Sequence, residues 1–417
     1  MSAVTTAAPP AGTETAASPL GQHVRAYLGR LRGGEMGALP AVLGLVVLCG
    51  VFAILRNVFL SPANFANLLA QGASIMVIAM GLVFVLLLGE IDLSAGYTSG
   101  LCAAVLAVLL TERGLPWYVA VLAALGTGMV IGTLIGSLVA KVGIPSFVVT
   151  LAAFLAFQGV MLLILDAGKN ISVRDPAIIA INSGGRLPPL VGWALLLAVV
   201  GAYAAVQLTR RGKRATRGLS VDPMALIAVR VGTLAAVGGI AVYVLNLERG
   251  RLIAVRGVPT VVLVVGLVLV AGTFVLSRTA YGRHIYAVGG NREAARRAGI
   301  NVDRIRISAF VISSTLAAVG GILAASRANS VDPNTGGSSV LLYAVGAAVI
   351  GGTSLFGGKG RLLDAVIGGA VIAVIVNGMG LMGYSAGVQY VVTGTVLLLA
   401  AGVDALSRRR AAAAGLR

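Results

Sequence analysis

A succession of long apolar stretches constrains this chain more than any other feature of its sequence. Most of them approach the roughly 20 residues that a helix needs to cross the hydrocarbon core of a bilayer. Hydrophobic residues make up 58% of the 417 residues and charged residues only 11%, which is far from the balance of a soluble domain. The sequence therefore predicts an all-α polytopic membrane protein with ten to twelve transmembrane helices, some of them broken or re-entrant.

Twelve stretches are candidates for membrane spans. They are Leu39–Leu55, Phe65–Leu88, Thr98–Leu110, Trp117–Ala140, Ile144–Leu165, Pro188–Leu208, Met224–Leu247, Val258–Leu276, Ile307–Ala325, Ser338–Phe356, Leu362–Met382 and Gly387–Leu406. The weakest are the third, which is short, and the tenth, which is rich in glycine, so a count of ten stays open. An even count places both termini on the same side of the membrane.

The distribution of positive charge predicts which side that is. Lys and Arg residues accumulate in the cytoplasmic loops of membrane proteins. With both termini cytoplasmic, most of the 32 Lys and Arg residues fall in cytoplasmic segments, and the loop from Tyr281 to Arg306 carries the largest group. The net charge of +18 is then a property of membrane topology, and nucleic acid is not an expected partner.

The charged loop from Tyr281 to Arg306 contains the pattern of a short helix. Asn291 can cap its start, residues 292–298 form its body, and Gly299 can end it. A short capped helix at the membrane surface is suited to docking a partner protein. The alternative is a solvated basic turn that only fixes the topology.

A second interruption, GEIDLSAG at residues 89–96, places Glu90, Asp92 and Ser94 between two apolar runs. Charges at membrane depth are costly unless they face water or a partner. This segment is either a broken-helix element beside a translocation path or an ordinary cytoplasmic turn, and the sequence favours neither reading.

A third interruption, IGGTSLFGGKG at residues 350–360, resembles a phosphate-binding loop only superficially. Thr353 stands where the first glycine of such a loop belongs, and Gly360 replaces the Ser or Thr that would contact magnesium. We find no Walker A site, no catalytic cluster, and no metal or cofactor site in this chain, so we do not expect it to be an enzyme.

Polar residues within the apolar spans are candidates for a translocation path. Gln158, Asn377 and Gln389 either form hydrogen bonds between helices or contact a hydrophilic substrate. The four-residue matches Phe147–Thr150 and Tyr390–Thr393 indicate an inverted-topology repeat, with chance identity as the alternative.

Four stretches together resemble the membrane permease subunits of bacterial ABC importers for sugars such as ribose and xylose. They are GEIDLSAG (89–96), GIPSFVVTL (143–151), YGRHIYAVGGNREAARRAGI (281–300) and AVIGGTSLFGGKG (348–360). The resemblance implies a multi-pass protein of the bacterial cell membrane that works with an ABC ATP-binding subunit, an extracytoplasmic sugar-binding protein and a second permease copy, and that moves a monosaccharide by alternating access. ATP hydrolysis would belong to the separate subunit.

The resemblance also assigns roles to residues. The coupling segment that meets the ATPase would comprise Gly289, Gly290, Asn291, Arg292, Glu293, Ala294, Ala295, Ala298, Gly299 and Ile300. Translocation-path candidates are Glu90, Asp92, Ser94, Ser146, Phe147, Gln158, Asn377 and Gln389. The additional pair of spans looks like the xylose-type subgroup, which makes xylose or a related pentose the expected cargo.

The expected organisation is one membrane domain with two tails. Residues 1–38 form a disordered cytoplasmic tail, 39–406 the permease domain, and 407–417 a basic cytoplasmic tail. Inside the domain lie an extra helix pair at 188–250 and the coupling loop at 277–306.

Two departures from the family pattern leave the cargo open. Glu90 replaces the glycine usual before IDLS, and Leu341 and Tyr343 stand where many members carry Glu and Asp. A permease for a nucleoside or a branched-chain amino acid, and a stand-alone secondary transporter, are the alternatives.

Overall fold

The computed structural model describes residues 37–166, 168–250 and 255–413 of the chain. Most of these residues are helical, and nine of the described helical spans are long and apolar enough to cross a membrane. Three shorter apolar helices account for the remaining predicted stretches, so each of the twelve is a helix. The all-α membrane fold expected from the sequence is confirmed, while residues 1–36 of the expected N-terminal tail lie outside the described part.

The longer helices are α3 (Pro62–Leu87), α4 (Ala95–Ala107), α5 (Trp117–Ser137), α6 (Ser146–Ile164), α8 (Pro189–Ala215), α9 (Met224–Asn246), α10 (Thr260–Arg278), α13 (Val302–Ala328) and α15 (Leu362–Leu381). The weak third stretch reaches spanning length because α4 continues through a π-helical turn, Val108–Glu112. A second such turn, Leu138–Val142, extends α5. The shorter apolar helices are α2 (Leu39–Leu55), α14 (Ser338–Ile350) and the apolar part of α16 (Ala386–Ala413).

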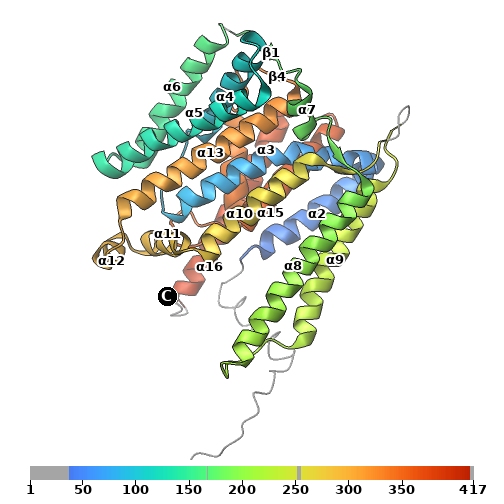
Figure 1. The fold of residues 1–417 in the computed structure, drawn as a ribbon, viewed down its shortest axis with the longest axis vertical. Coiled ribbons are helices and arrows are strands. Elements are labelled where there is room, and N and C mark those ends of the chain that lie inside the picture. Colours follow the sequence, from blue (N-terminus) through green and yellow to red (C-terminus); the bar gives the residue numbers. More distant parts are fainter. Residues whose placement is uncertain (1–36, 167, 251–254, 414–417) are drawn as a thin grey trace, which may run out of the picture.

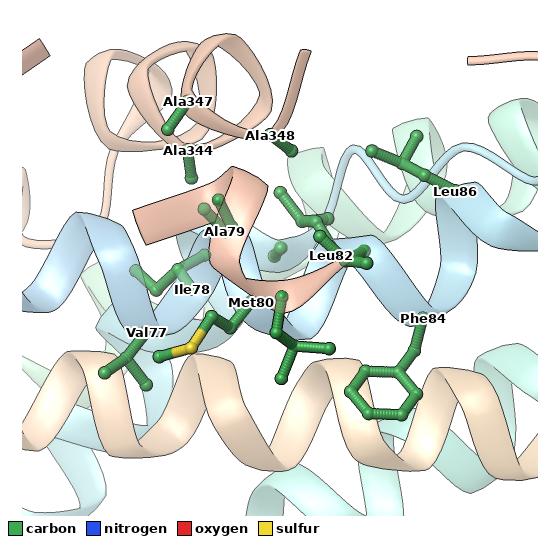
Figure 2. Packing of buried hydrophobic residues seen from close by; sticks show 14 of the residues in the cluster. Val77, Ile78, Ala79, Met80, Leu82, Phe84, Leu86, Ala344, Ala347 and Ala348 are labelled. Carbon is green, nitrogen blue, oxygen red and sulfur yellow. The ribbon is translucent and has the colours of Figure 1, made fainter. Parts of the chain in front are cut away.

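Helix α3 is the centre of the bundle (Figure 1). Of the 18-residue apolar stretch that lets it span a membrane, 78% is buried inside the protein. It contains no charged residue, and small residues such as Ala73 and Ala79 are fully buried. Figure 2 shows side chains of α3, among them Ile78 and Leu82, packed under Ala344, Ala347 and Ala348 of α14. Alanines on the facing helix allow close approach of the backbones, which is how helices associate in lipid.

Glycine determines how closely α5 approaches α13. Gly128, Gly132 and Gly136 are spaced by four residues and so share one face of α5. A Cβ atom at Gly132 would lie only 2.5 Å from the Cα atom of Val311. The two helices therefore contact each other backbone to backbone, as small-residue stripes permit in membranes.

Helices α8 and α9 form a hairpin at the edge of the bundle and extend beyond it (Figure 1). Only 6% of the apolar stretch of α8 and 11% of that of α9 is buried inside the protein. Two short antiparallel strand pairs lie at the end of the molecule remote from α12 (Arg292–Arg297). Strand β1 (Ile171–Ser172) pairs with β4 (Ser330–Val331), and β2 (Arg186–Leu187) pairs with β3 (Val258–Pro259).

Candidate functional site

The charged segment after α10 contains two helices. Helix α11 (Ala280–Gly290) was not predicted from the sequence, where its residues were expected to be part of a loop. Helix α12 follows directly and has the predicted cap, because the Asn291 side chain accepts a hydrogen bond from the Ala294 amide at 2.9 Å. Gly299 ends the turn with a φ of +82°, which favours glycine.

The carboxylate of Glu90 joins this segment to the interior of the bundle. Glu90 lies in the loop between α3 and α4 and is 5% exposed. Its Oε1 atom accepts from Arg292 Nη2 at 2.7 Å and from Arg306 Nη2 at 2.7 Å. Arg292 Nη2 also donates to the carbonyl of Leu88 at 3.1 Å. One buried carboxylate thus holds α12, the start of α13 and the end of α3 together.

Asp92 anchors the same loop from its other side. Its Oδ1 atom accepts from the Ser94 amide at 3.0 Å and the Ser94 hydroxyl at 2.6 Å, while Oδ2 accepts from the Ser313 hydroxyl of α13 at 3.1 Å. Asp92 is 1% exposed, and a buried carboxylate requires such partners. Both acidic residues of GEIDLSAG are therefore satisfied within the protein.

The first turn of α6 holds the loop backbone between the two carboxylates. The Ser146 hydroxyl accepts from the Ile91 amide at 3.2 Å, and the Thr150 hydroxyl donates to the Ile91 carbonyl at 3.2 Å. These residues belong to GIPSFVVTL, so that motif supports the interrupted helix.

The glycine-rich loop before α15 completes the site. The Gly358 amide donates to the Leu87 carbonyl at 2.8 Å, and the Tyr286 hydroxyl of α11 donates to the Gly360 carbonyl at 2.8 Å. Gly289 lies against the same carbonyl of Leu87, where a Cβ atom would come within 1.8 Å. All four stretches that carry the family resemblance therefore meet at one end of the bundle.

The surface of the coupling segment is mixed in character. Its exposed residues are Gly290, Asn291, Arg292, Glu293, Ala294, Ala298 and Gly299. Gly289 and Ile300 are partly buried, whereas Ala295 is 4% exposed and packs in the core. Phe356 lies in the glycine-rich loop beside this segment and is 76% exposed, and no pattern in the sequence marked it as a site residue.

The eight path candidates do not gather in one place. Glu90, Asp92 and Ser94 lie in the loop described above, Ser146 contacts it from α6, and the nearby Phe147 is 52% exposed on α6. The others lie apart: Gln158 on α6 is partly buried, the Asn377 amide of α15 exchanges hydrogen bonds with Asn64 of α3 at 2.9 and 3.0 Å, and Gln389 Nε2 donates to the carbonyl of Tyr384 at 3.1 Å.

Several residues of this site could not be picked out from the sequence. Arg306, Ser313, Thr150 and Tyr286 are brought to the loop by tertiary packing. The signals in the sequence were the surplus of arginines at 281–306 and the two family-like stretches that contain Thr150 and Tyr286. Within the described residues, no cluster of His, Cys, Asp or Glu is arranged to hold a metal ion.

Comparison with known proteins identifies the family. The family model "Branched-chain amino acid transport system / permease component" matches residues 64–401. The chain belongs to this permease family. It is 39% identical to the xylose transport system permease protein XylH of Escherichia coli over 355 residues, which cover 84% of this chain and 87% of that protein. This permease is a multi-pass protein of the inner membrane.

Two further relatives extend the comparison. The Haemophilus influenzae protein named xylose transport system permease protein XylH is 33% identical over 91% of this chain and 99% of its own length. The ribose import permease protein RbsC of Escherichia coli is 31% identical over 87% of this chain and 92% of its own length. The search of solved structures gave no match. The predicted resemblance to sugar permeases of the ribose and xylose type is confirmed.

Proposed function

We propose that this permease is the membrane-spanning subunit of an ATP-driven ABC importer that carries a monosaccharide, xylose or a related pentose, by alternating access. The names of its relatives support a sugar as the cargo and favour xylose over ribose, because identity to the xylose permease of Escherichia coli is higher. A separate ATP-binding subunit would hydrolyse ATP, an extracytoplasmic binding protein would deliver the sugar, and two permease copies would enclose the path.

The observation that carries the mechanism is the pair of ion pairs on Glu90. An ATPase that docks on the exposed face of α11 and α12 would move the coupling segment as a rigid body. Arg292 and Arg306 tie that segment to Glu90, so the motion reaches the loop at residues 88–94 directly. Asp92 and Ser313 then pass it to α13, which packs along α3, α4 and α5.

The orientation follows from this assignment and from the positive charges. The end of the bundle with α12 would face the cytoplasm, because the coupling loop at 277–306 carries seven arginines there beside the docking surface. Both termini would be cytoplasmic as well.

Reconstitution tests the proposal. The permease is placed in proteoliposomes with the ATP-binding subunit and the sugar-binding protein of the same organism, and pentoses and hexoses are screened for stimulated ATP hydrolysis and uptake. We expect xylose or a related pentose to stimulate both. Uptake that needs an ion gradient and no ATPase would instead establish a secondary transporter, and failure with every sugar would end the sugar assignment.

A further inference from the structure

A polar pocket lies at the end of the bundle opposite α12. The first turns of α3, the residues after α7 (Pro176–Asn182), the connection between α9 and α10 and the last turn of α13 line it, and its volume is about 360 Å³. The described residues that line it include three arginines, Arg186, Arg249 and Arg327, and no Asp or Glu. The pocket is therefore strongly positive.

Arg249 has hydrogen-bond donors without acceptors. Its Nη2 atom donates to the carbonyl of Gly257 at 2.6 Å, but Nε and Nη1 are buried and have no partner. Burial and the positive charge of Arg186 lower the pKa of Arg249. A guanidinium group nevertheless stays protonated in proteins, so its two buried donors, Nε and Nη1, lack an acceptor that an anion in the pocket would supply.

Nearby protein groups do not supply that anion. Glu248 is already engaged, since it accepts from the Val255 amide at 2.8 Å and from Arg256 Nε at 2.8 Å. Arg327 Nη2 donates to the neutral amide oxygen of Asn67 at 2.8 Å. Within the described residues, none of the three pocket arginines pairs with a carboxylate.

The pocket also contains an acceptor without a donor. Asn182 Nδ2 donates to the carbonyls of Ala70 at 3.2 Å and Leu323 at 3.1 Å, which fixes the orientation of the amide. Its Oδ1 atom is buried and has no partner. A ligand that satisfies the whole pocket must therefore present anionic oxygens to the arginines and a hydroxyl to Asn182.

We propose that this pocket binds a phosphate group, carried either by the hydroxyl-bearing headgroup of an anionic phospholipid or by free phosphate. A tetrahedral phosphate offers enough oxygens for guanidinium groups that approach from three different elements. Arg186 precedes α8 and Arg249 follows α9, two helices with exposed apolar faces such as Leu190, Leu197 and Ile240. The pocket thus lies where these helices leave the apolar layer, at the level of lipid headgroups.

The test compares the wild-type protein with Arg249→Gln and Arg186→Gln, and with Arg113→Gln as a control. Arg113 is exposed in the connection between α4 and α5 and does not line the pocket. In one arm, phosphatidylglycerol retained by each protein after purification is counted by mass spectrometry. In the other, delipidated protein in detergent is titrated with inorganic phosphate at constant ionic strength, and the melting temperature is followed.

We expect the pocket variants to lose affinity by about tenfold or more, because a hydrogen bond to a charged group is stronger than one between neutral groups. The control should match the wild-type protein, and Arg249→Lys should recover part of the affinity. If the pocket variants lose only the retained phosphatidylglycerol, the ligand is a lipid headgroup. If they lose the response of the melting temperature to phosphate, the ligand is free phosphate. Melting temperatures without ligand show that each variant is folded.

Two results would overturn the proposal. One is that the pocket variants and the wild-type protein behave alike in both arms. The other is that Arg249→Gln loses only the binding of an extracytoplasmic protein, which would assign the pocket to an acidic side chain of that partner. Neither result depends on which solute the permease transports.

Discussion

Arg306 binds the carboxylate of Glu90 through two nitrogen atoms, Nε at 2.9 Å and Nη2 at 2.7 Å, across 216 residues of sequence. Only 13% of the Arg306 side chain is exposed, so most of this contact is shielded from water. Arg292 shares the same carboxylate oxygen from a more exposed position. This relationship makes Glu90 the residue whose replacement should best separate ATPase binding from transport.

We expect Glu90→Gln to uncouple the importer. Breaking a fully buried ion pair costs about 3–5 kcal/mol, and the loss here should be smaller because Arg292 is partly exposed. The variant should melt at a lower temperature and retain ATPase binding, but sugar should no longer stimulate ATP hydrolysis. The control is Asp166→Asn, which removes an exposed pair with Lys169 outside the coupling segment. Equal stimulation in both variants would contradict the role of Glu90.

Substitutions at two adjacent glycines of α11 should affect ATPase docking and permease stability separately. A Cβ atom at Gly290 meets nothing within 4 Å, so Gly290→Trp should leave the melting temperature unchanged and prevent co-purification of the ATP-binding subunit. Gly289→Ala should instead destabilise the permease itself, because its Cβ atom would overlap the Leu87 carbonyl. Normal co-purification with Gly290→Trp would place the docking surface elsewhere.

The approach of α5 to α13 should depend on its glycines. We expect Gly132→Leu to lower the free energy of unfolding by at least about 1–3 kcal/mol, the usual cost of overpacking, because even a Cβ atom there would lie 2.5 Å from Val311. Gly126→Leu is the matched control, since the same helix leaves open space at that position. Thermal melting in detergent measures both, and an equal response would argue against backbone contact.

The paired amides of Asn64 and Asn377 should show a measurable coupling energy. Each donates to the other, and the pair links α3 to α15. A double-mutant cycle with Asn64→Ala and Asn377→Ala should give about 0.6 kcal/mol and at most about 1.7 kcal/mol, the range found for such bonds in membranes. A value near zero would leave Asn377 free to contact substrate.

Local features of the fold could be predicted from the sequence, because they depend on near neighbours. The lengths of the apolar stretches predicted the membrane-spanning helices, and Asn291 and Gly299 marked the ends of α12 correctly. Helix α11 escaped prediction because Gly282, Gly289 and Gly290 disfavour a helix. Packing overrides that preference: Gly282 fits against the Leu276 carbonyl, where a Cβ atom would lie 2.1 Å away.

The assembly of the candidate site could not be predicted, because it depends on contacts between distant segments. Any of many arginines could have paired with Glu90, and nothing in the chain's order singles out Arg306. Likewise Gln389 looked like a path residue, but its amide donates to the backbone at Tyr384. Its role in transport, and the inverted repeat, stay predictions.

The pairing of β2 with β3 sets Leu187 beside Val258, at the base of the α8 and α9 hairpin. Both helices of that hairpin contribute little to the interior. A protein engineer could therefore join residue 187 to residue 258 through a short turn and obtain a smaller permease core. Such a minimal permease would lack Arg249 while keeping Glu90, Arg292 and Arg306, so the two ends of the molecule could be studied independently.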